Sequence, residues 1–406
     1  MPLYPRHHID IAIDDLGAAL VSCARDLRSE AEAERLESFV APDGEVLAMH
    51  SVRSGFDLLL TALALPPGSE VLLSALTIPD MPRIVRAHGL VAVPVDVDAA
   101  TLSPTEAALE QAWSPQAKVL VVAQLFGGRA SLDAARAFAL RRGLLFVDDD
   151  AQGYTGPSCL APRDADVVFH SFGTIKTATC LGGALVRVRD ATLRADMRAE
   201  HARWPVHPTA TYAKKLALYT TLLVPREPHA YTLFAACAER FGGGLDSVVM
   251  SMTKGFPSAD LRGFLQSIRR RPCGPLLALL RRRIASFDPH RLQRRAEAGE
   301  RLLRALAHDV EVLGGAQRAR THWLFAVLLA KPDAPIAILR RAGFDAARGA
   351  TSIAAVPAPD ERPQLVPAQA LAAMERVLFV PVYPEISQAD RDRLAASLVA
   401  VSRAPR

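Results

Sequence analysis

The sequence predicts an α/β protein whose large domain is built on a mostly parallel β-sheet. Between about residues 47 and 188, short apolar runs alternate with segments of helical periodicity. Strands that alternate with helices are joined by right-handed crossovers into parallel sheets. Both faces of such sheets are covered, which is why their strands are almost wholly apolar. With 406 residues, half of them apolar, the chain is long enough for a second, smaller domain.

Each element of this fold has a segment of its own. Five apolar runs are predicted to be buried strands, at residues 70–74, 91–95, 119–123, 144–147 and 167–169. Helical periodicity marks residues 56–65, 81–88, 105–112 and 132–142. Residues 296–401 are predicted to form a smaller α+β domain, with strands near 323–329 and 377–380. We therefore predict an N-terminal arm over residues 1–40 and a large domain over residues 41–255. An interdomain helix and the small C-terminal domain follow over residues 256–406.

Charge and cysteine content exclude several classes of protein. The net charge of +5 and the pI near 9.1 would suit a nucleic-acid partner. However, the chain has no zinc-ligand spacing, no aromatic-rich basic motif and no basic tail, so we expect none. The five cysteines are scattered and never in CxxC spacing, which favours free thiols in a reducing cytoplasm and no metal. The first eight residues lack the layout of a signal peptide, and no apolar run reaches the roughly 20 residues that span a bilayer. We expect a cytoplasmic protein.

The stretch from 200 to 290 differs from the rest because apolar runs are flanked there by basic residues. Examples are residues 216–224 and 275–283. One interpretation is a dimer interface together with the helix that joins the two domains. The other is weak contact of residues 215–290 with a membrane surface or an anionic head group. We favour the first interpretation and expect a homodimer.

An acidic cluster and a lone lysine follow two of the predicted strands. Asp148–Asp150 come after the fourth strand, and Ser171 and Lys176 come after the fifth. Ligands of parallel sheets bind at this edge, so these groups can converge. Pyridoxal 5′-phosphate (PLP) needs a carboxylate for its pyridine nitrogen, an amine for a Schiff base and a hydroxyl for its phosphate. An acidic turn can also lie in solvent or bind a metal, and a loop lysine can be exposed. Lys176 is, however, the only formal charge between residues 169 and 184, which favours a buried, functional amine.

A glycine marks a candidate phosphate site. Gly55 is predicted to lie where the segment 48–54 meets a helix that begins near Phe56. The first turn of a helix presents free N–H groups and the positive end of the helix dipole, which together favour a phosphate. Many helices begin after a Ser-Gly pair, so this signal depends on the rest of the cofactor interpretation.

In this order and spacing, the motifs resemble the DegT/StrS family of PLP-dependent sugar aminotransferases. The matching segments are Ser54–Gly55, 67–71 with Thr77, 95–98, 124–127, 148–152, 171–176 and 379–387. The resemblance implies the fold of the fold-type I PLP enzymes, a mostly parallel seven-stranded type of sheet with a smaller C-terminal α+β domain.

The resemblance also implies a role for individual residues. Lys176 would form the Schiff base and carry the proton, and Asp149 would pair with the pyridine nitrogen. Gln152 would hold the O3′ side of the ring, and Ser171 would bind the phosphate with the backbone of Gly55 and Phe56. The implied cofactor-binding residues are Gly55, Phe56, Ile78, Asp149, Gln152, Ser171 and Lys176.

The sequence departs from the family at several of these positions. Phe56 replaces the usual threonine of the phosphate loop, and Ile78 replaces the aromatic residue that stacks on the ring. The family's segment that reaches the partner subunit is matched best by residues 255–258, which lack its asparagine and arginine. These changes leave Asp149 and Lys176 intact but weaken the inference of a nucleotide-sugar substrate.

The expected activity is transfer of an amino group from an amino acid, with glutamate as the candidate donor, to a carbonyl acceptor. By resemblance that acceptor is a keto-sugar. Two alternatives stay open: a PLP enzyme with a lipid-linked or other non-sugar substrate and a different reaction, or a non-catalytic regulatory relative. Arg348 is a further candidate for gripping a substrate carboxylate, against its simpler interpretation as a surface arginine.

Overall fold

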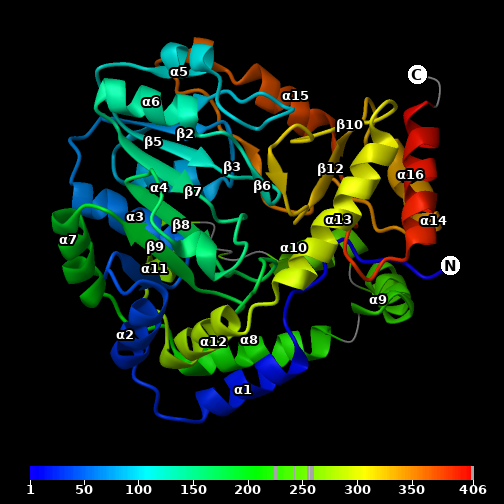
Figure 1. Cartoon of the computed structure of the whole chain (residues 1–406), viewed down its shortest axis with the longest axis horizontal. Helices are drawn as coiled ribbons and strands as arrows, with labels where there is room; N and C mark the ends of the chain where they lie inside the picture. The colour runs from blue at the N-terminus through cyan, green and yellow to red at the C-terminus, as the bar shows by residue number, and fades with distance from the viewer. Residues whose placement is uncertain (224–225, 242, 254–255, 257–259, 404–406) are drawn as a thin grey trace.

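The computed structural model describes residues 1–223, 226–241, 243–253, 256 and 260–403 (Figure 1). Its centre is a seven-stranded sheet in the order β1–β9–β8–β7–β5–β2–β4. The strands are β1 (Val46–Met49), β2 (Glu70–Ser74), β4 (Val91–Val95), β5 (Ala117–Ala123), β7 (Leu145–Asp149), β8 (Val167–Ser171) and β9 (Ala184–Val188). Neighbours from β8 to β4 run parallel, whereas β9 is antiparallel to β8 and β1. The predicted mostly parallel sheet is confirmed, and the five predicted strands lie within two residues of their expected ends.

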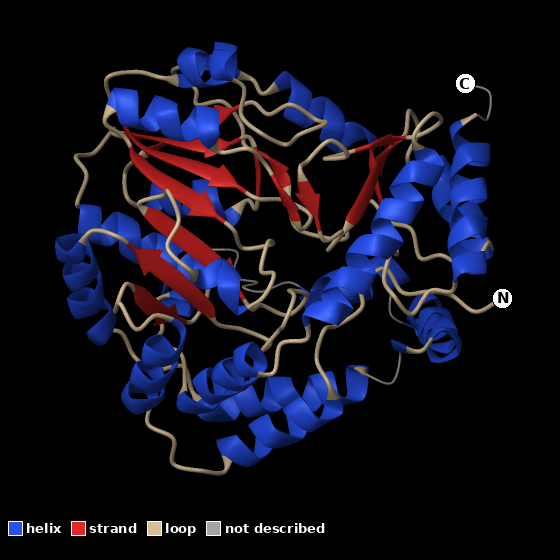
Figure 2. Cartoon of the chain, viewed as in Figure 1, coloured by secondary structure: helices blue, strands red, loops and turns tan. Residues whose placement is uncertain are grey.

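Helices cover both faces of this sheet (Figures 1 and 2). On one face, α3 (Val52–Leu63), α4 (Asp80–Ala87), α7 (Ala191–Ala202) and α11 (Leu261–Ile268) share a hydrophobic cluster with the strands. On the other face, α5 (Glu106–Ala112) and α6 (Asp133–Arg142) cover β2, β4, β5 and β7. Beside them, α1 (Ile13–Cys23), α2 (Ser29–Val40), α8 (Thr209–Leu222) and α12 (Gly274–Ala285) cover β1 and β9. Successive strand residues alternate between these clusters, as the two-residue period of a strand requires.

The C-terminal part forms a second, smaller layer beside the carboxyl edge of the sheet. Its three strands lie in the order β10 (Glu311–Val312), β12 (Phe325–Leu328), β14 (Val377–Val380). α13 (Pro289–Leu306), α14 (Ala334–Arg341) and α16 (Gln388–Ser402) pack on them in one cluster, and α15 (Ala368–Arg376) packs toward the large sheet. Both strands predicted in this region are therefore present.

Two short ribbons join the C-terminal part to the large sheet. β11 (Ala319–Arg320) pairs with β6 (Gly128–Arg129), and β13 (Ala354–Ala355) pairs with β3 (Leu76–Thr77). Short 3-10 helices lie at Pro157–Leu160 and Pro363–Leu365. The ribbons place loops of the small part against the carboxyl ends of the large strands, where the candidate site residues lie.

The N-terminal 40 residues are folded onto the rest of the same chain. α1 and α2 pack against α12 through their apolar faces. Ahead of them, Tyr4 pairs with Phe344, and Arg6 forms a buried ion pair with Asp345, with Nε 2.7 Å from Oδ2. The predicted arm is thus anchored by helix packing and by a buried charge pair within one chain.

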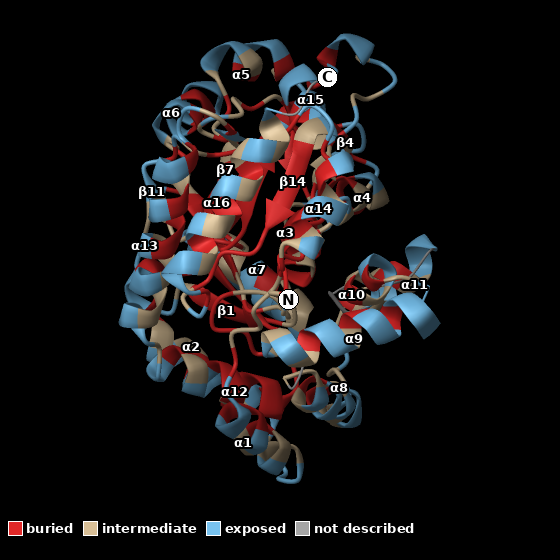
Figure 3. Cartoon of the chain, turned by 90° about the vertical axis from the view of Figure 1, so that its right-hand side faces the viewer, coloured by how far each residue is buried: buried red, intermediate tan, exposed pale blue. Residues whose placement is uncertain are grey.

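The stretch from 200 to 290 is helical and divides into two kinds of surface. The leucines of α12 are buried against α1 and α2, so residues 275–280 form neither a dimer interface nor a membrane surface. In contrast, α9 (Pro228–Phe241) stands out beside α10 (Leu245–Thr253), as Figure 3 shows, and exposes Leu233 and Phe241. α11 and α12 pack with the large sheet. Of residues 255–258, only Phe256 lies among the described residues.

Across the described residues, no helix combines the length and the apolar character needed to cross a membrane.

Candidate active site

The acidic cluster and the lysine meet at the carboxyl edge of the large sheet. Asp149 is the last residue of β7, and Ser171 is the last residue of its parallel neighbour β8. The chain turns sharply after Ser171, with the Lys176 N–H donating to the Gly173 carbonyl at 2.9 Å. This turn brings the lysine amine back over the strand ends, where it acts electrostatically on Asp149.

Burial shifts both groups toward their neutral forms. It lowers the pKa of Lys176 to about 7, and the attraction of Asp149 only partly offsets this effect. It raises the pKa of Asp149 to about 6, opposed by the Lys176 amine. Near neutral pH, a substantial fraction of the lysine is therefore an unprotonated amine, the nucleophilic form.

The three neighbouring acids at the end of β7 differ in their charged partners. Asp148 and Asp150 point to the same side and share Arg163, whose guanidinium lies 2.9 Å from Asp148 Oδ2 and 2.7 Å from Asp150 Oδ2. Arg129 lies 3.5 Å from Asp150 as well. Asp149 points to the opposite side because strand residues alternate. Among the described residues, no cation lies within salt-bridge distance of it, and the cation that acts on it through space is Lys176. The geometry thus separates one available carboxylate from two that are already neutralised.

The helix start predicted near Phe56 is wrong. α3 begins at Val52, and Ser51 is its N-cap, accepting from the Ser54 N–H at 3.1 Å. The Gly55 N–H is already used by the Ser51 carbonyl, at 3.0 Å. The amides that a helix leaves without an internal partner therefore lie at Val52 and Arg53. The sequence contains a signal for this helix start, because serine is a favoured N-cap residue and Ser51 lies three positions before Ser54, whose N–H it accepts.

Gly55 and Phe56 instead serve packing. A Cβ at Gly55 would lie 2.7 Å from Val186 Cγ2 and 3.2 Å from Phe169 Cε1, so glycine lets α3 approach the sheet closely. Phe56 is fully buried in the same cluster, edge-on to Phe169 with ring centroids 6.3 Å apart. Its side chain faces the core.

The other predicted residues lie along the same edge. Gln152 accepts a hydrogen bond from the Phe126 N–H at 2.7 Å through Oε1, which fixes the orientation of its amide. Ser171 Oγ accepts a long hydrogen bond from the Gly173 N–H at 3.4 Å. Ile78 follows β3 and is half-buried between two hydrophobic clusters.

Two residues near the lysine were not predicted. Lys176 Nζ lies 4.2 Å from the centroid of the Trp323 ring, a cation–π geometry, and Trp323 Nε1 donates to the Ile175 carbonyl at 2.6 Å. Arg53, at the start of α3, bonds to Asp80 and also lowers the pKa of Lys176. Neither has a local sequence motif, since Trp323 lies 147 residues from Lys176 and only folding brings the two together.

A small cavity lies beside the lysine, between the large sheet and the C-terminal part. Polar and charged residues line much of it, among them Arg6, His7, His8, Asp10, Lys176, Arg295 and Tyr383. A half-buried amine at the wall of a polar cavity is an arrangement suited to covalent amine chemistry.

Comparison with known proteins agrees with this geometry. The sequence model described as the DegT/DnrJ/EryC1/StrS aminotransferase family matches residues 29–207. The chain is similar in structure to the aminotransferase TlmJ from Streptoalloteichus hindustanus, with a TM-score of 0.68 and 17% identity over 98% of this chain and 100% of that one. Sugar aminotransferase CalS13 from Micromonospora echinospora gives a TM-score of 0.68 with 20% identity, over 98% and 100% of the two chains. The PLP form of the putative sugar aminotransferase Spr1654 from Streptococcus pneumoniae gives 0.67 with 17% identity, over 98% of each.

The fold is that of the fold-type I PLP-dependent aminotransferases, and the amine–carboxylate pair lies at the strand ends of its large sheet. The match of residues 29–207 to the DegT/DnrJ/EryC1/StrS aminotransferase family model confirms the resemblance inferred from the motifs.

Proposed function

We propose that the protein transfers an amino group from an amino acid, with glutamate as the donor, to a keto-sugar, and that Lys176 binds PLP as a Schiff base. The observation that carries this proposal is the pair of half-buried Lys176 and buried Asp149 at the carboxyl edge of the sheet, beside a polar cavity. When bound, PLP supplies an electron sink that stabilises negative charge at the donor carbon.

Asp149 fits the ring nitrogen of the cofactor. It is buried, points away from the arginines that neutralise Asp148 and Asp150, and so retains an uncompensated carboxylate. A buried carboxylate of this kind favours a cationic partner within reach. In our proposal it keeps the pyridine nitrogen protonated.

Lys176 fits the second role, which needs an amine that is unprotonated at neutral pH. Its lowered pKa of about 7 lets the amine attack an aldehyde and, once released, take and return a proton at the donor carbon. The Trp323 ring limits the positions open to Nζ and excludes water from one side.

The other residues proposed to contact PLP are chosen by their positions along the carboxyl edge of the sheet. Ser171 and the free amides of Val52 and Arg53 would hold the phosphate, in place of the amides of Gly55 and Phe56 that the resemblance implied. Gln152 would hold the O3′ side of the ring, and Ile78 would cover the ring where relatives carry an aromatic residue.

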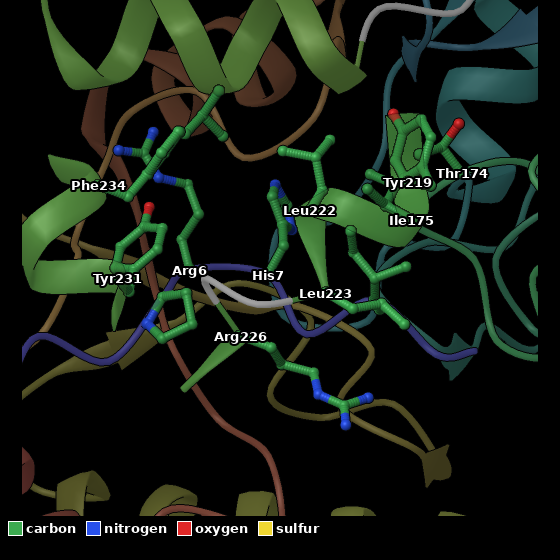
Figure 4. A pocket seen from close by; sticks show the side chains of 13 residues that line it. Arg6, His7, Thr174, Ile175, Tyr219, Leu222, Leu223, Arg226, Tyr231 and Phe234 are labelled. Carbon is green, nitrogen blue, oxygen red and sulfur yellow. The ribbon is translucent and has the colours of Figure 1, made fainter. Parts of the chain in front are cut away.

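A second candidate concerns the acceptor. An apolar cavity of about 650 Å³ adjoins the lysine cavity and shares Arg6, His7 and Ile175 with it. Figure 4 shows His7 and Leu222 between Tyr231 and Phe234 on one side and Ile175 and Tyr219 on the other. A space lined in this way would bind an apolar group, so the alternative acceptor is a lipid-linked or otherwise apolar carbonyl compound. A comparison of turnover with keto-sugars and with aliphatic ketones would separate the two.

We also propose a homodimer in the cytoplasm. The exposed apolar side chains of α8 and α9, such as Leu218 and Leu233, support an interface there. Light scattering would measure the mass in solution. Flotation with anionic vesicles would test the alternative, weak membrane contact through residues 215–290.

The visible absorption spectrum tests the chemistry directly. We expect a cofactor band in the wild type that is lost on adding glutamate, and no such band in Lys176→Ala. A band that no amino acid changes would move the reaction elsewhere. Absence of the band, even with added PLP, would favour a regulatory protein that kept only the fold.

Asp149→Asn is expected to keep the band but slow the glutamate reaction by at least about 100-fold, as for a lost charged catalytic contact. Asp148→Asn is the matched control, because it removes a neighbouring carboxylate that points away from Lys176. Equal loss in both variants would contradict the assignment of Asp149.

A further inference from the structure

Arg295 of α13 is a half-buried arginine whose guanidinium has no carboxylate partner among the described residues. Desolvation of the guanidinium lowers its pKa to about 10. Nε donates to the Thr321 carbonyl and Nη2 donates to Thr177 Oγ1, both at 3.0 Å. Within the described residues, no carboxylate lies within salt-bridge distance of it, whereas the buried Arg6 and Arg163 are both paired with aspartates. An unpaired buried charge is costly, so such a group is usually completed by a ligand.

This guanidinium borders the cavity that contains the lysine amine. Arg295 and Lys176 line the same cavity, and Thr177, which holds Nη2, is the residue after Lys176. The Tyr383 hydroxyl lies on the same wall, is nearly fully buried, and has no hydrogen-bond partner among the described residues. His7 contributes a second such atom, Nε2. The cavity thus contains both an unneutralised cation and unused hydrogen-bonding groups.

The other charges that face the cavity are already neutralised. Asp10 is paired with Arg283 and Arg291 and also accepts the Ala178 N–H at 2.8 Å. Arg6 is paired with Asp345. Asp10 and Glu385 act on Arg295 only through space, and Arg291 opposes them. The charge left over in the cavity is therefore positive, beside the reacting amine.

We propose that Arg295 binds the α-carboxylate of the amino donor, with the Tyr383 hydroxyl as a second donor. This inference rests on the proposed aminotransferase activity. A guanidinium has five N–H groups, and two of them donate to Thr321 and Thr177, which leaves three for a ligand. The α-carboxylate fits best because it is bonded to the carbon whose amino group must reach Lys176. Arg295 is hydrogen-bonded to Thr177, the residue after Lys176, so a carboxylate bound to Arg295 would hold that carbon close to the lysine amine.

The first test measures binding without any reaction. Glutarate carries the carboxylates of glutamate but no amino group, and glutaramide is its neutral counterpart. We expect calorimetry on the purified wild type to show glutarate binding and no glutaramide binding. In Arg295→Gln, we expect glutarate affinity to fall by roughly 100-fold, the scale of a lost charged hydrogen-bonding pair. Arg348→Gln is the matched control, since Arg348 lies outside this cavity and is paired with Asp333.

The second test follows the cofactor band with donors that have or lack a carboxylate. Arg295→Gln should raise the half-saturating glutamate concentration by roughly 100-fold. It should leave the reaction with a simple alkylamine within about threefold, which a general loss of structure would not do. Arg295→Lys should recover part of the glutamate affinity, since it keeps the charge but not the planar fork.

The outcomes separate this inference from the proposed activity. A cofactor band without glutarate binding to the wild type would overturn the role of Arg295 and leave the activity intact. Glutarate binding that needs Arg295, in a protein with no cofactor band, would support the anion site and remove the proposed activity. Equal losses for glutamate and alkylamine in Arg295→Gln would show a structural role and overturn the inference, as would unchanged glutarate affinity.

Discussion

Gly55→Ala distinguishes a packing role of Gly55 from a phosphate contact. The added Cβ would lie 2.7 Å from Val186 Cγ2, about 1 Å inside an ordinary carbon–carbon contact. Such overpacking costs about 1–3 kcal/mol, while replacing glycine by alanine within a helix recovers about 1 kcal/mol. We therefore expect Gly55→Ala to lower the stability of the cofactor-free protein by up to about 2 kcal/mol.

The reason for that loss can be checked by removing the obstacle. Val186→Ala alone should cost about 2 kcal/mol, because it deletes two buried methyl groups and leaves a small cavity. In the Val186→Ala background the 2.7 Å clash is gone and only the milder 3.2 Å contact with Phe169 Cε1 remains, so Gly55→Ala should become neutral or stabilising by up to about 1 kcal/mol. Urea unfolding of the four proteins measures this change of sign as a double-mutant cycle.

The affinity for PLP is the measurement that can refute the packing explanation. Since the Gly55 N–H is already bonded within the helix, PLP affinity should stay within about threefold in the double variant. If Gly55→Ala left stability unchanged and weakened PLP binding in both backgrounds, the packing explanation would be wrong. The phosphate contact predicted from the sequence would then be right.

Two further predictions concern charges in the site. Covalent loading of PLP should accelerate as pH rises through about 7, because the lowered pKa of Lys176 makes the neutral amine available there rather than near 10.5. Stopped-flow absorbance measures the midpoint of this pH dependence. A midpoint above 9 would contradict the lowered pKa of Lys176. Arg163→Gln should lower stability by about 3–5 kcal/mol at pH 8, because it leaves Asp148 and Asp150 buried without their cation. The pKa of Asp148 is raised to about 6 and that of Asp150 is raised as well, so both carboxyls become neutral as pH falls. The loss of stability caused by Arg163→Gln should therefore shrink at pH 5. Equal losses of stability at both pH values in urea unfolding would refute the charge argument.

Local patterns were enough for the framework of the large domain. The strands of the central sheet are continuous apolar runs, and such runs are recognisable because parallel strands are buried on both faces. The helix start was harder to place, since Ser51 and Ser54 can both cap a helix and only packing against β9 selects the first. The strands β1 and β9 were not predicted, because each pairs with a segment more than 130 residues away.

The candidate site was also predicted in part from the sequence. Spacing and resemblance placed an acidic residue and a lysine at adjacent strand ends, since the carboxyl ends of parallel strands share one edge. Resemblance selected Asp149 from its neighbours, and the structure supplies the physical reason for that choice. Alternation along β7 turns Asp148 and Asp150 toward Arg163, and Asp149 toward Lys176.

The sequence by itself determined the order of the five parallel strands and of the helices between them, the positions of Lys176 and Asp149 at one edge of the sheet, and the family motifs that connect them to PLP. These are local features, set by periodicity and by residues a few positions apart. Only the tertiary structure decided what surrounds them. Trp323 over the amine and Arg295 on the cavity wall come from segments more than a hundred residues away. No local pattern encodes such contacts, because they arise when the C-terminal part packs against the carboxyl edge of the large sheet.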